Sequence, residues 1–144
     1  MPAPDPDKLK AFSFQVFDAL QGAMTAAMIH LGDKLGLYRA LAEADGPLTS
    51  EQLAARTELD ERWVREWLHA QGAARVLDYA GEGRFGLSPE GRVVLADESH
   101  PAFGCGMFSS LPSTMGVLDK LPEAFRTGVG LAYDAFGPEG ARGV

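Results

Sequence analysis

Apolar residues recur at steps of three and four along residues 9–35, as helical residues that share one face do. These positions are Leu9, Phe12, Val16, Leu20, Met24, Met28, Leu31 and Leu35. The spacing predicts a long amphipathic helix from residue 7 to about residue 34, with the stripe able to cover its own winged helix. Phe14, Phe17, Ala26 and Ile29 widen the apolar arc beyond that face. The helix is either a core helix of a monomer or one buried on two sides, and its length favours a second chain on the second side.

The next segment, residues 36–97, has the element order of a winged helix-turn-helix. A short helix over 37–42 precedes Thr49, which forms a capping box with Gln52 and starts a helix that ends near Arg56. Asp60 is the expected cap of a longer helix that runs to Gly72. Two short alternating segments, 75–79 and 84–87, then predict a β-hairpin, which is the wing. Another helix should run from Pro89 to Ala96.

The remaining residues predict shorter helices and a glycine-rich tail. Pro101 is expected to start a helix, whose apolar positions are Phe103, Met107, Leu111, Met115 and Leu118. Pro112 should kink or break it, because proline lacks the amide that an interior helical position donates. A further short helix is expected over 121–125, before Gly128. We therefore expect four parts: a long dimerisation helix (1–35), the winged helix (36–97), C-terminal helices (98–130) and a linker towards an absent catalytic domain (131–144).

Two glycine patterns resemble nucleotide-binding loops but lack the context that such loops need. Gly81, Gly83 and Gly86 are spaced G-x-G-x-x-G, yet a returning strand rather than a helix follows them. We interpret these glycines as hairpin residues with positive φ. The Gly104-Cys105-Gly106 triplet follows no buried strand. The sequence therefore predicts no cofactor-binding residue in this chain.

No catalytic or metal-binding constellation is predicted either. The lone cysteine, Cys105, has no basic neighbour or partner histidine in sequence, which indicates an inert thiol. His30 and Asp33 share a helix face but have no evident third ligand. One cysteine, no apolar membrane span and no signal-peptide pattern at the N-terminus lead us to expect a cytoplasmic protein.

The charge disfavours nucleic acid as a partner. The chain has a formal net charge of −7 and a pI of about 4.9. Within the winged helix, residues 37–88 carry more acids than bases and net −3, and the expected recognition helix is itself slightly acidic. Because phosphate contacts require the opposite sign, DNA binding is disfavoured.

Nearly the whole chain resembles a known family. The run "HLGDKLGLYRALAEADGPLTSEQLAARTELDERWVREWLHAQGAARVLDYAGEGRFGLSPEG" resembles the N-terminal domain of bacterial class I S-adenosylmethionine-dependent methyltransferases that act on small molecules. Segments 123–128 and 133–137 are similar to the stretch that leads into the family's catalytic domain. The resemblance implies a mainly α, winged-helix domain that mediates dimerisation, helps to cover the substrate pocket and does not usually bind DNA.

The family's cofactor loop lies on a Rossmann-like domain that this sequence does not contain. S-adenosylmethionine is thus implied only for a full-length parent, and no activity is expected from this chain alone, which is either a truncated piece or a stand-alone descendant. A lid over an apolar substrate pocket would use Phe12, Phe17, Met24, Met28, Phe103, Met107 and Phe108. A homodimer interface would use Phe14, Phe17, Gly22, Ala26 and Ile29. The alternatives are a DNA-binding winged-helix regulator and a stand-alone binder of an apolar small molecule.

Overall fold

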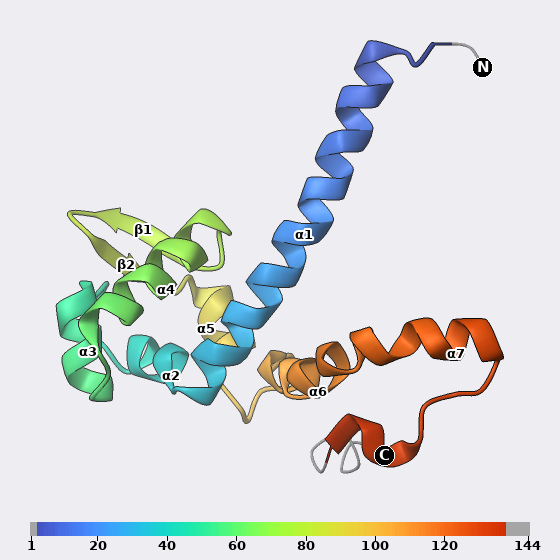
Figure 1. The fold of residues 1–144 in the computed structure, drawn as a ribbon. Helices are drawn as coiled ribbons and strands as arrows, with labels where there is room; N and C mark the ends of the chain where they lie inside the picture. The colour runs from blue at the N-terminus through green and yellow to red at the C-terminus, as the bar shows by residue number, and fades with distance from the viewer. Residues whose placement is uncertain (1–2, 138–144) are drawn as a thin grey trace.

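The computed structural model describes residues 3–137, and most of them lie in helices (Figure 1). The first helix, α1 (Pro6–Lys34), is the long helix that the apolar spacing predicted. The side chain of Asp5 caps it by accepting hydrogen bonds from the backbone N–H groups of Asp7 and Lys8. Pro6 fits the first turn because the amide it lacks would have no helical acceptor there.

The winged helix-turn-helix is confirmed. Its elements are α2 (Leu37–Ala42), α3 (Ser50–Thr57), α4 (Glu61–Ala73), β1 (Asp78–Gly81), β2 (Arg84–Gly86) and α5 (Pro89–Ala96). The capping box at the start of α3 is complete, since Thr49 accepts from the amide of Gln52 and the Gln52 side chain accepts from the amide of Thr49. Asp60 caps α4 and Ser88 caps α5, both as expected from the sequence.

The wing begins later than the sequence predicted. Residues 75–77 do not form a strand, because the backbone N–H groups of Val76 and Leu77 both donate to the carbonyl of Gln71. Arg75 adopts a left-handed conformation at φ 59°, so this stretch terminates α4. The antiparallel hairpin then pairs Tyr79 with Phe85, and glycines with positive φ form its turn.

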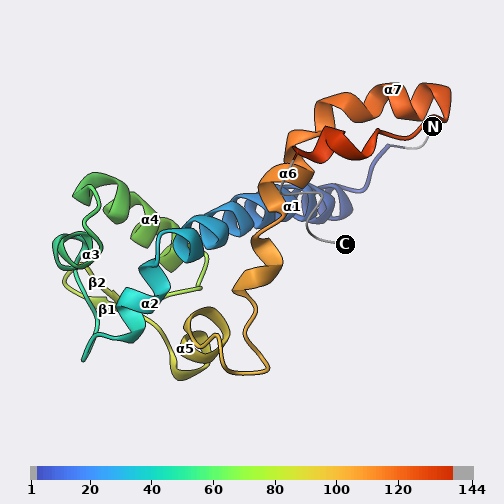
Figure 2. The same ribbon diagram turned by 90° about the horizontal axis from the view of Figure 1, so that it is seen from below.

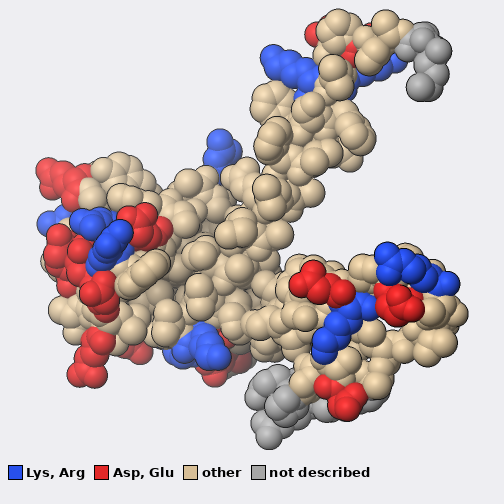
Figure 3. All heavy atoms as spheres, viewed as in Figure 1, with Lys and Arg blue, Asp and Glu red and all other residues tan. Residues whose placement is uncertain are grey.

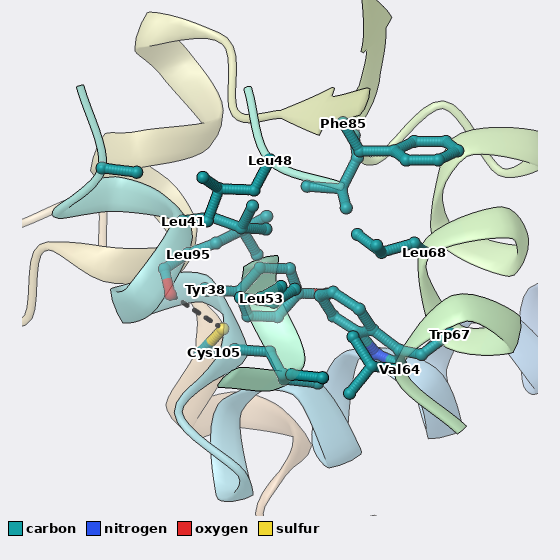
Figure 4. Close-up of a cluster of buried hydrophobic side chains, with 14 residues drawn as sticks. Tyr38, Leu41, Leu48, Leu53, Val64, Trp67, Leu68, Phe85, Leu95 and Cys105 are labelled. Atoms are coloured by element: carbon teal, nitrogen blue, oxygen red, sulfur yellow. Dashed lines mark hydrogen bonds between the residues drawn. The ribbon is translucent and has the colours of Figure 1, made fainter. Parts of the chain in front are cut away.

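One apolar core joins helices α2, α3, α4 and α5, the β-hairpin and the segment after α5 (Figure 4). Tyr38 packs edge-on against Trp67 with ring centroids 5.2 Å apart, and its hydroxyl donates to the side-chain oxygen of Gln71. The buried members of this core are Leu37, Tyr38, Leu41, Ala44, Leu48, Leu53, Ala54, Val64, Trp67, Leu68, Leu77, Phe85, Leu95 and Cys105.

The C-terminal segment departs from the single helix expected after Pro101. It forms η1 (Cys105–Phe108), α6 (Leu111–Gly116), η2 (Leu118–Lys120), α7 (Leu121–Thr127) and η3 (Tyr133–Phe136). The backbone N–H of Gly104 donates to the carbonyl of Val94 at 2.8 Å and holds the preceding turn against α5. Pro112 lies in the first turn of α6, so the predicted break is confirmed. Gly128 ends α7 at φ 71°; residues 138–144 of the expected linker lie outside the described residues.

The two ends of the molecule extend away from the winged-helix body. In Figure 1, α1 rises beyond the body as a lone helix, and α6 and α7 extend on another side. Figure 2 shows the winged helix gathered around the C-terminal end of α1. None of the helices among residues 3–137 has the length and apolar character needed to cross a membrane.

Candidate functional site

An apolar concave site lies between α1 and α4, the helix in the recognition position of the winged helix. It has a volume of about 570 Å³, within the range of small-molecule pockets. We call it the α1–α4 groove; its lining residues are Met28, Leu31, Leu35, Leu37, Leu59, Asp60, Trp63, Val64, Glu66, Trp67 and Ala70. The indole N–H of Trp67 donates to the backbone carbonyl of Met28 at 2.9 Å and fixes the two helices to each other.

The charged residues that line this groove are both acidic. Asp60 caps α4, and Glu66 lies one turn and a half further along the same helix. Trp63 lies between them in sequence and leaves 74% of its surface exposed. Figure 3 shows acidic and basic side chains interspersed over the winged-helix body, without a continuous basic surface on that face. The groove is therefore apolar with an acidic margin.

The second feature is the N-terminal part of α1, residues 6–24, which we call the α1 arm. Every residue of the arm is exposed, including Phe12 at 63%, Phe14 at 58% and Phe17 at 67%. The sequence led us to expect that the stripe from Leu9 to Leu35 covers its own winged helix. Instead the helix extends past the body, so most of that stripe faces solvent. A soluble monomer rarely exposes this many large apolar side chains on one helix.

The structure does not bring the seven predicted lid residues together in one place. Phe12 and Phe17 lie on the arm, while Met24 and Met28 line a shallow hollow beside the C-terminal end of α4. Phe103 packs against the core, Met107 is 78% exposed, and Phe108 lines a third hollow. Among these seven residues, Met28 lines the α1–α4 groove.

The predicted interface residues fall on two hollows of α1. Phe14 and Phe17 line one on the arm. Gly22, Ala26 and Ile29 line another of about 380 Å³, to which Phe108 of the same chain also contributes. Ile29 is half-buried and packs against the core, so this arc is partly occupied by the chain itself.

Sequence reasoning missed most of the groove, which includes Leu31, Leu35, Leu59 and Trp63. The sequence favours packing over base contacts for both Trp63 and Trp67; Trp67 is buried, but the expectation is wrong for Trp63, which is 74% exposed. The available signal was that two tryptophans four residues apart share one helix face.

The titratable groups of the core offer no nucleophile. Cys105 is fully buried, its thiol donates to the carbonyl of Leu95 at 3.4 Å (Figure 4), and burial together with nearby Asp33 raises its pKa to about 11. Burial is also the main reason that the pKa of Tyr38 lies above its ordinary value. Within residues 3–137, no three His, Cys, Asp or Glu side chains gather as metal ligands do.

Known proteins with similar sequence include a methyltransferase. The chain is 33% identical over 103 residues to 8-amino-8-demethylriboflavin N,N-dimethyltransferase of Streptomyces davaonensis. That match covers 72% of this chain and 27% of the relative. The chain thus spans well under half of the length of this relative.

Solved structures of several methyltransferases contain a region with the fold of this chain. The mitomycin 7-O-methyltransferase MmcR superposes with a TM-score of 0.70 at 27% identity, over 92% of this chain and 38% of that one. N,N-8-amino-8-demethyl-D-riboflavin dimethyltransferase (RosA) from Streptomyces davawensis gives a TM-score of 0.63 at 29% identity, over 93% of this chain and 36% of that one. Human N-acetylserotonin methyltransferase shares the fold, with a TM-score of 0.71 at 20% identity over 95% of this chain and 39% of that one.

These matches confirm the resemblance to the winged-helix region of methyltransferases that the sequence motifs indicated. A family model of the Rv2258c-like winged HTH domain matches residues 23–96, which is more than half of the chain and includes all of the winged helix. The chain therefore belongs to the family of Rv2258c-like winged helix-turn-helix domains.

Proposed function

We propose that this chain is the dimerisation and substrate-lid domain of an S-adenosylmethionine-dependent methyltransferase that acts on a small molecule. S-adenosylmethionine would bind to a part of the parent enzyme that these residues do not span. The observation that carries the proposal is the position of α4, which faces α1 across an apolar groove instead of presenting a basic surface. Because α4 packs against α1 of the same chain, we infer that it has a structural role and not a role in reading DNA.

The same observation disfavours a DNA-binding regulator. A helix that enters the major groove needs a free face with basic or amide side chains. The face of α4 towards the α1–α4 groove contributes Trp63, Glu66 and Trp67, and Trp67 is hydrogen-bonded to α1. The matches to methyltransferases favour the same conclusion.

Homodimerisation is supported by the exposed α1 arm. Six large apolar side chains of residues 9–20 are each more than half exposed. Ordinary soluble monomers scatter such residues and do not collect them on one helix. A two-fold axis is the simplest way for a surface to be covered by a copy of itself. The interface residues proposed from sequence, Phe14, Phe17, Gly22, Ala26 and Ile29, all lie on this helix.

The lid role is supported by soft apolar side chains beside α1. Met24 and Met28 of α1 border α4, and Phe108 lines a neighbouring hollow of the same helix. Methionine and phenylalanine form adaptable walls for flat, apolar substrates. We propose such a molecule as the methyl acceptor, and a cytoplasmic location for the enzyme.

Calorimetry with S-adenosylmethionine tests whether this chain has a cofactor site of its own. We expect no binding heat, because the glycines that imitate a nucleotide loop form the turn of a hairpin. Micromolar binding that disappears in Gly83→Val would contradict the proposal. Gly128→Val is the matched control, since both glycines have φ 71° and open space where a Cβ would lie.

A further inference from the structure

We propose that the α1–α4 groove is a binding site for a neutral, planar aromatic molecule that carries a hydroxyl or amine donor. Of the seven residues expected to form the substrate lid, only Met28 lines this groove. The groove is thus a second small-molecule site, formed by residues of this chain alone, and the inference goes beyond the proposed function.

The groove reaches down to the core of the winged helix. Three of its lining residues, Leu37, Val64 and Trp67, are at most 5% exposed and belong to the apolar core. Leu31 and Leu35 of α1 also line the groove and remain exposed. A hollow of about 570 Å³ whose floor consists of core side chains has the size and the apolar lining of a small-molecule pocket.

The walls of the groove are held in place by contacts within the chain. The indole N–H of Trp67 donates to the backbone carbonyl of Met28, and the ring of Trp67 packs edge-on against Tyr38. A Cβ at Gly32 would lie 2.5 Å from the Trp67 ring, so α1 and this ring are already in close contact. A preformed site of this kind loses little conformational entropy when a ligand binds.

Two indole rings give the groove its preference for planar aromatic molecules. Trp63 and Trp67 are four residues apart on α4, and both line the groove. Trp67 is buried, whereas Trp63 is exposed and packs against no other aromatic ring among the residues that the structure describes. Aromatic rings attract one another in offset-stacked and edge-on arrangements. A flat ligand in the groove would therefore cover the exposed ring of Trp63.

The polar groups of the groove favour a neutral ligand with a hydrogen-bond donor. The carboxylate of Asp60 already accepts the backbone N–H groups of Arg62 and Trp63. Glu66 also lines the groove and forms no ion pair within residues 3–137, so its carboxylate can accept an O–H or N–H of a ligand. Lys34 on α1 and Arg62 on α4 adjoin lining residues in sequence. Because bases flank the two acids, charge favours neither an anion nor a cation.

A fluorescence titration of the 144-residue chain with N-phenyl-1-naphthylamine tests the site. This probe is neutral and aromatic, emits strongly in apolar surroundings and accepts energy from tryptophan. Both tryptophans of the chain, Trp63 and Trp67, line the groove. We expect the probe to quench their emission in a saturable way, with a dissociation constant in the micromolar range.

Ala70→Phe should fill part of the groove, since Ala70 lines it, and should weaken binding of the probe by about tenfold or more. Ala55→Phe is the matched control, because Ala55 is an exposed helical alanine that does not line the groove. A second control is Phe12→Ser/Phe14→Ser/Phe17→Ser, which removes the exposed phenylalanines of the α1 arm. Both controls should bind the probe as wild type does, and circular dichroism checks that every variant is folded.

Displacement of the probe by two naphthalenes tests the donor. Glu66→Ala should weaken the binding of 2-naphthol by about 3–10-fold, because the hydroxyl loses its acceptor. The same variant should leave 2-methylnaphthalene, which has no donor, almost unchanged. Glu43→Ala, which removes an exposed carboxylate outside the groove, should change neither affinity.

The outcomes separate this site from the proposed function. Quenching that is lost in Ala70→Phe and kept in both controls supports the site. Quenching that is lost in the arm variant but kept in Ala70→Phe places the probe on the arm and overturns it, as does the absence of quenching at high micromolar probe. Equal weakening of both naphthalenes by Glu66→Ala overturns the proposed ligand class. Light scattering on the same samples measures the dimer independently, so a dimer without probe binding leaves the proposed function intact.

Discussion

The indole nitrogen of Trp67 donates a hydrogen bond of 2.9 Å to the backbone carbonyl of Met28 and joins the winged helix to α1. Trp67 also packs edge-on against Tyr38, and its ring leaves 5% of its surface exposed. Trp67 therefore helps to hold the long helix against the body at the α1–α4 groove.

Trp67→Phe should lower the free energy of unfolding by about 1–3 kcal/mol. The variant loses one hydrogen bond and part of a buried ring, while Trp67→Ala should cost about 3–5 kcal/mol through the larger cavity. Urea denaturation followed by circular dichroism measures both. Phe125→Leu is the control, since Phe125 is 87% exposed and should change stability by less than about 0.5 kcal/mol. Equal stability of Trp67→Ala and wild type would refute the role of this contact.

Gly32→Ala should destabilise the protein, although alanine is the better helix former. A Cβ at Gly32 would lie 2.5 Å from the Trp67 ring and 2.7 Å from the Tyr38 ring, both of which are held in the core. Overpacking of this kind costs about 1–3 kcal/mol. Gly22→Ala on the same helix meets no atom within 4 Å and should gain up to about 1 kcal/mol from helix propensity. Opposite signs in thermal unfolding are the expected result, and a stabilised Gly32→Ala would contradict the packing.

The buried thiol of Cys105 should react slowly and should make folding sensitive to high pH. Its pKa of about 11 in the folded state lies above its ordinary value of 9.0, mainly because burial disfavours the thiolate. Folding therefore keeps its full contribution from this group below about pH 9 and loses it as the pH rises towards 11. One such group changes stability by at most about 1.4 kcal/mol per pH unit.

Two measurements check this prediction. Iodoacetamide at pH 8 should modify native protein far more slowly than urea-unfolded protein. The melting temperature should fall between pH 9 and 11, and less so in Cys105→Ala than in wild type after each is normalised to pH 8. Rapid labelling of the native thiol would show that Cys105 is accessible, against its buried position.

The isolated chain should have negligible affinity for DNA at physiological salt. The winged helix has a net negative charge, and neutralising phosphates requires the opposite sign. A gel-shift titration across ionic strengths checks this. Sequence-selective binding that weakens with salt, and that Arg62→Ala/Arg65→Ala abolishes, would favour the regulator instead.

The elements that the sequence predicted correctly are those with local causes. The capping box of Thr49 and Gln52 and the cap of Asp60 depend on groups within three residues of each other, so their pattern is readable in the chain. The sequence placed the start of the wing too early, because the backbone N–H groups of Val76 and Leu77 donate to the carbonyl of Gln71 and extend the end of α4. The helix expected at Pro101 does not form there, since Gly104 is bound to α5.

The groove could not be predicted because both apolar arcs of α1 look alike in sequence. Which arc the body covers depends on Trp67, Tyr38 and the buried Gly32, which meet only in the folded chain. The pattern therefore indicated a helix with more than one apolar face but not which face remained free. The structure shows that the body covers only the C-terminal part of α1 and leaves every residue of the α1 arm exposed.

The dimerisation role, which is the central claim, is tested most directly by multi-angle light scattering on the native 144-residue chain over a range of concentrations. We predict a mass of twice 15.4 kDa, because an apolar surface as large as that of the α1 arm rarely stays exposed on a soluble monomer. The dimer should persist in high salt, since apolar burial is its main source of stability. A chain that remains at 15.4 kDa at high micromolar concentration would contradict the account.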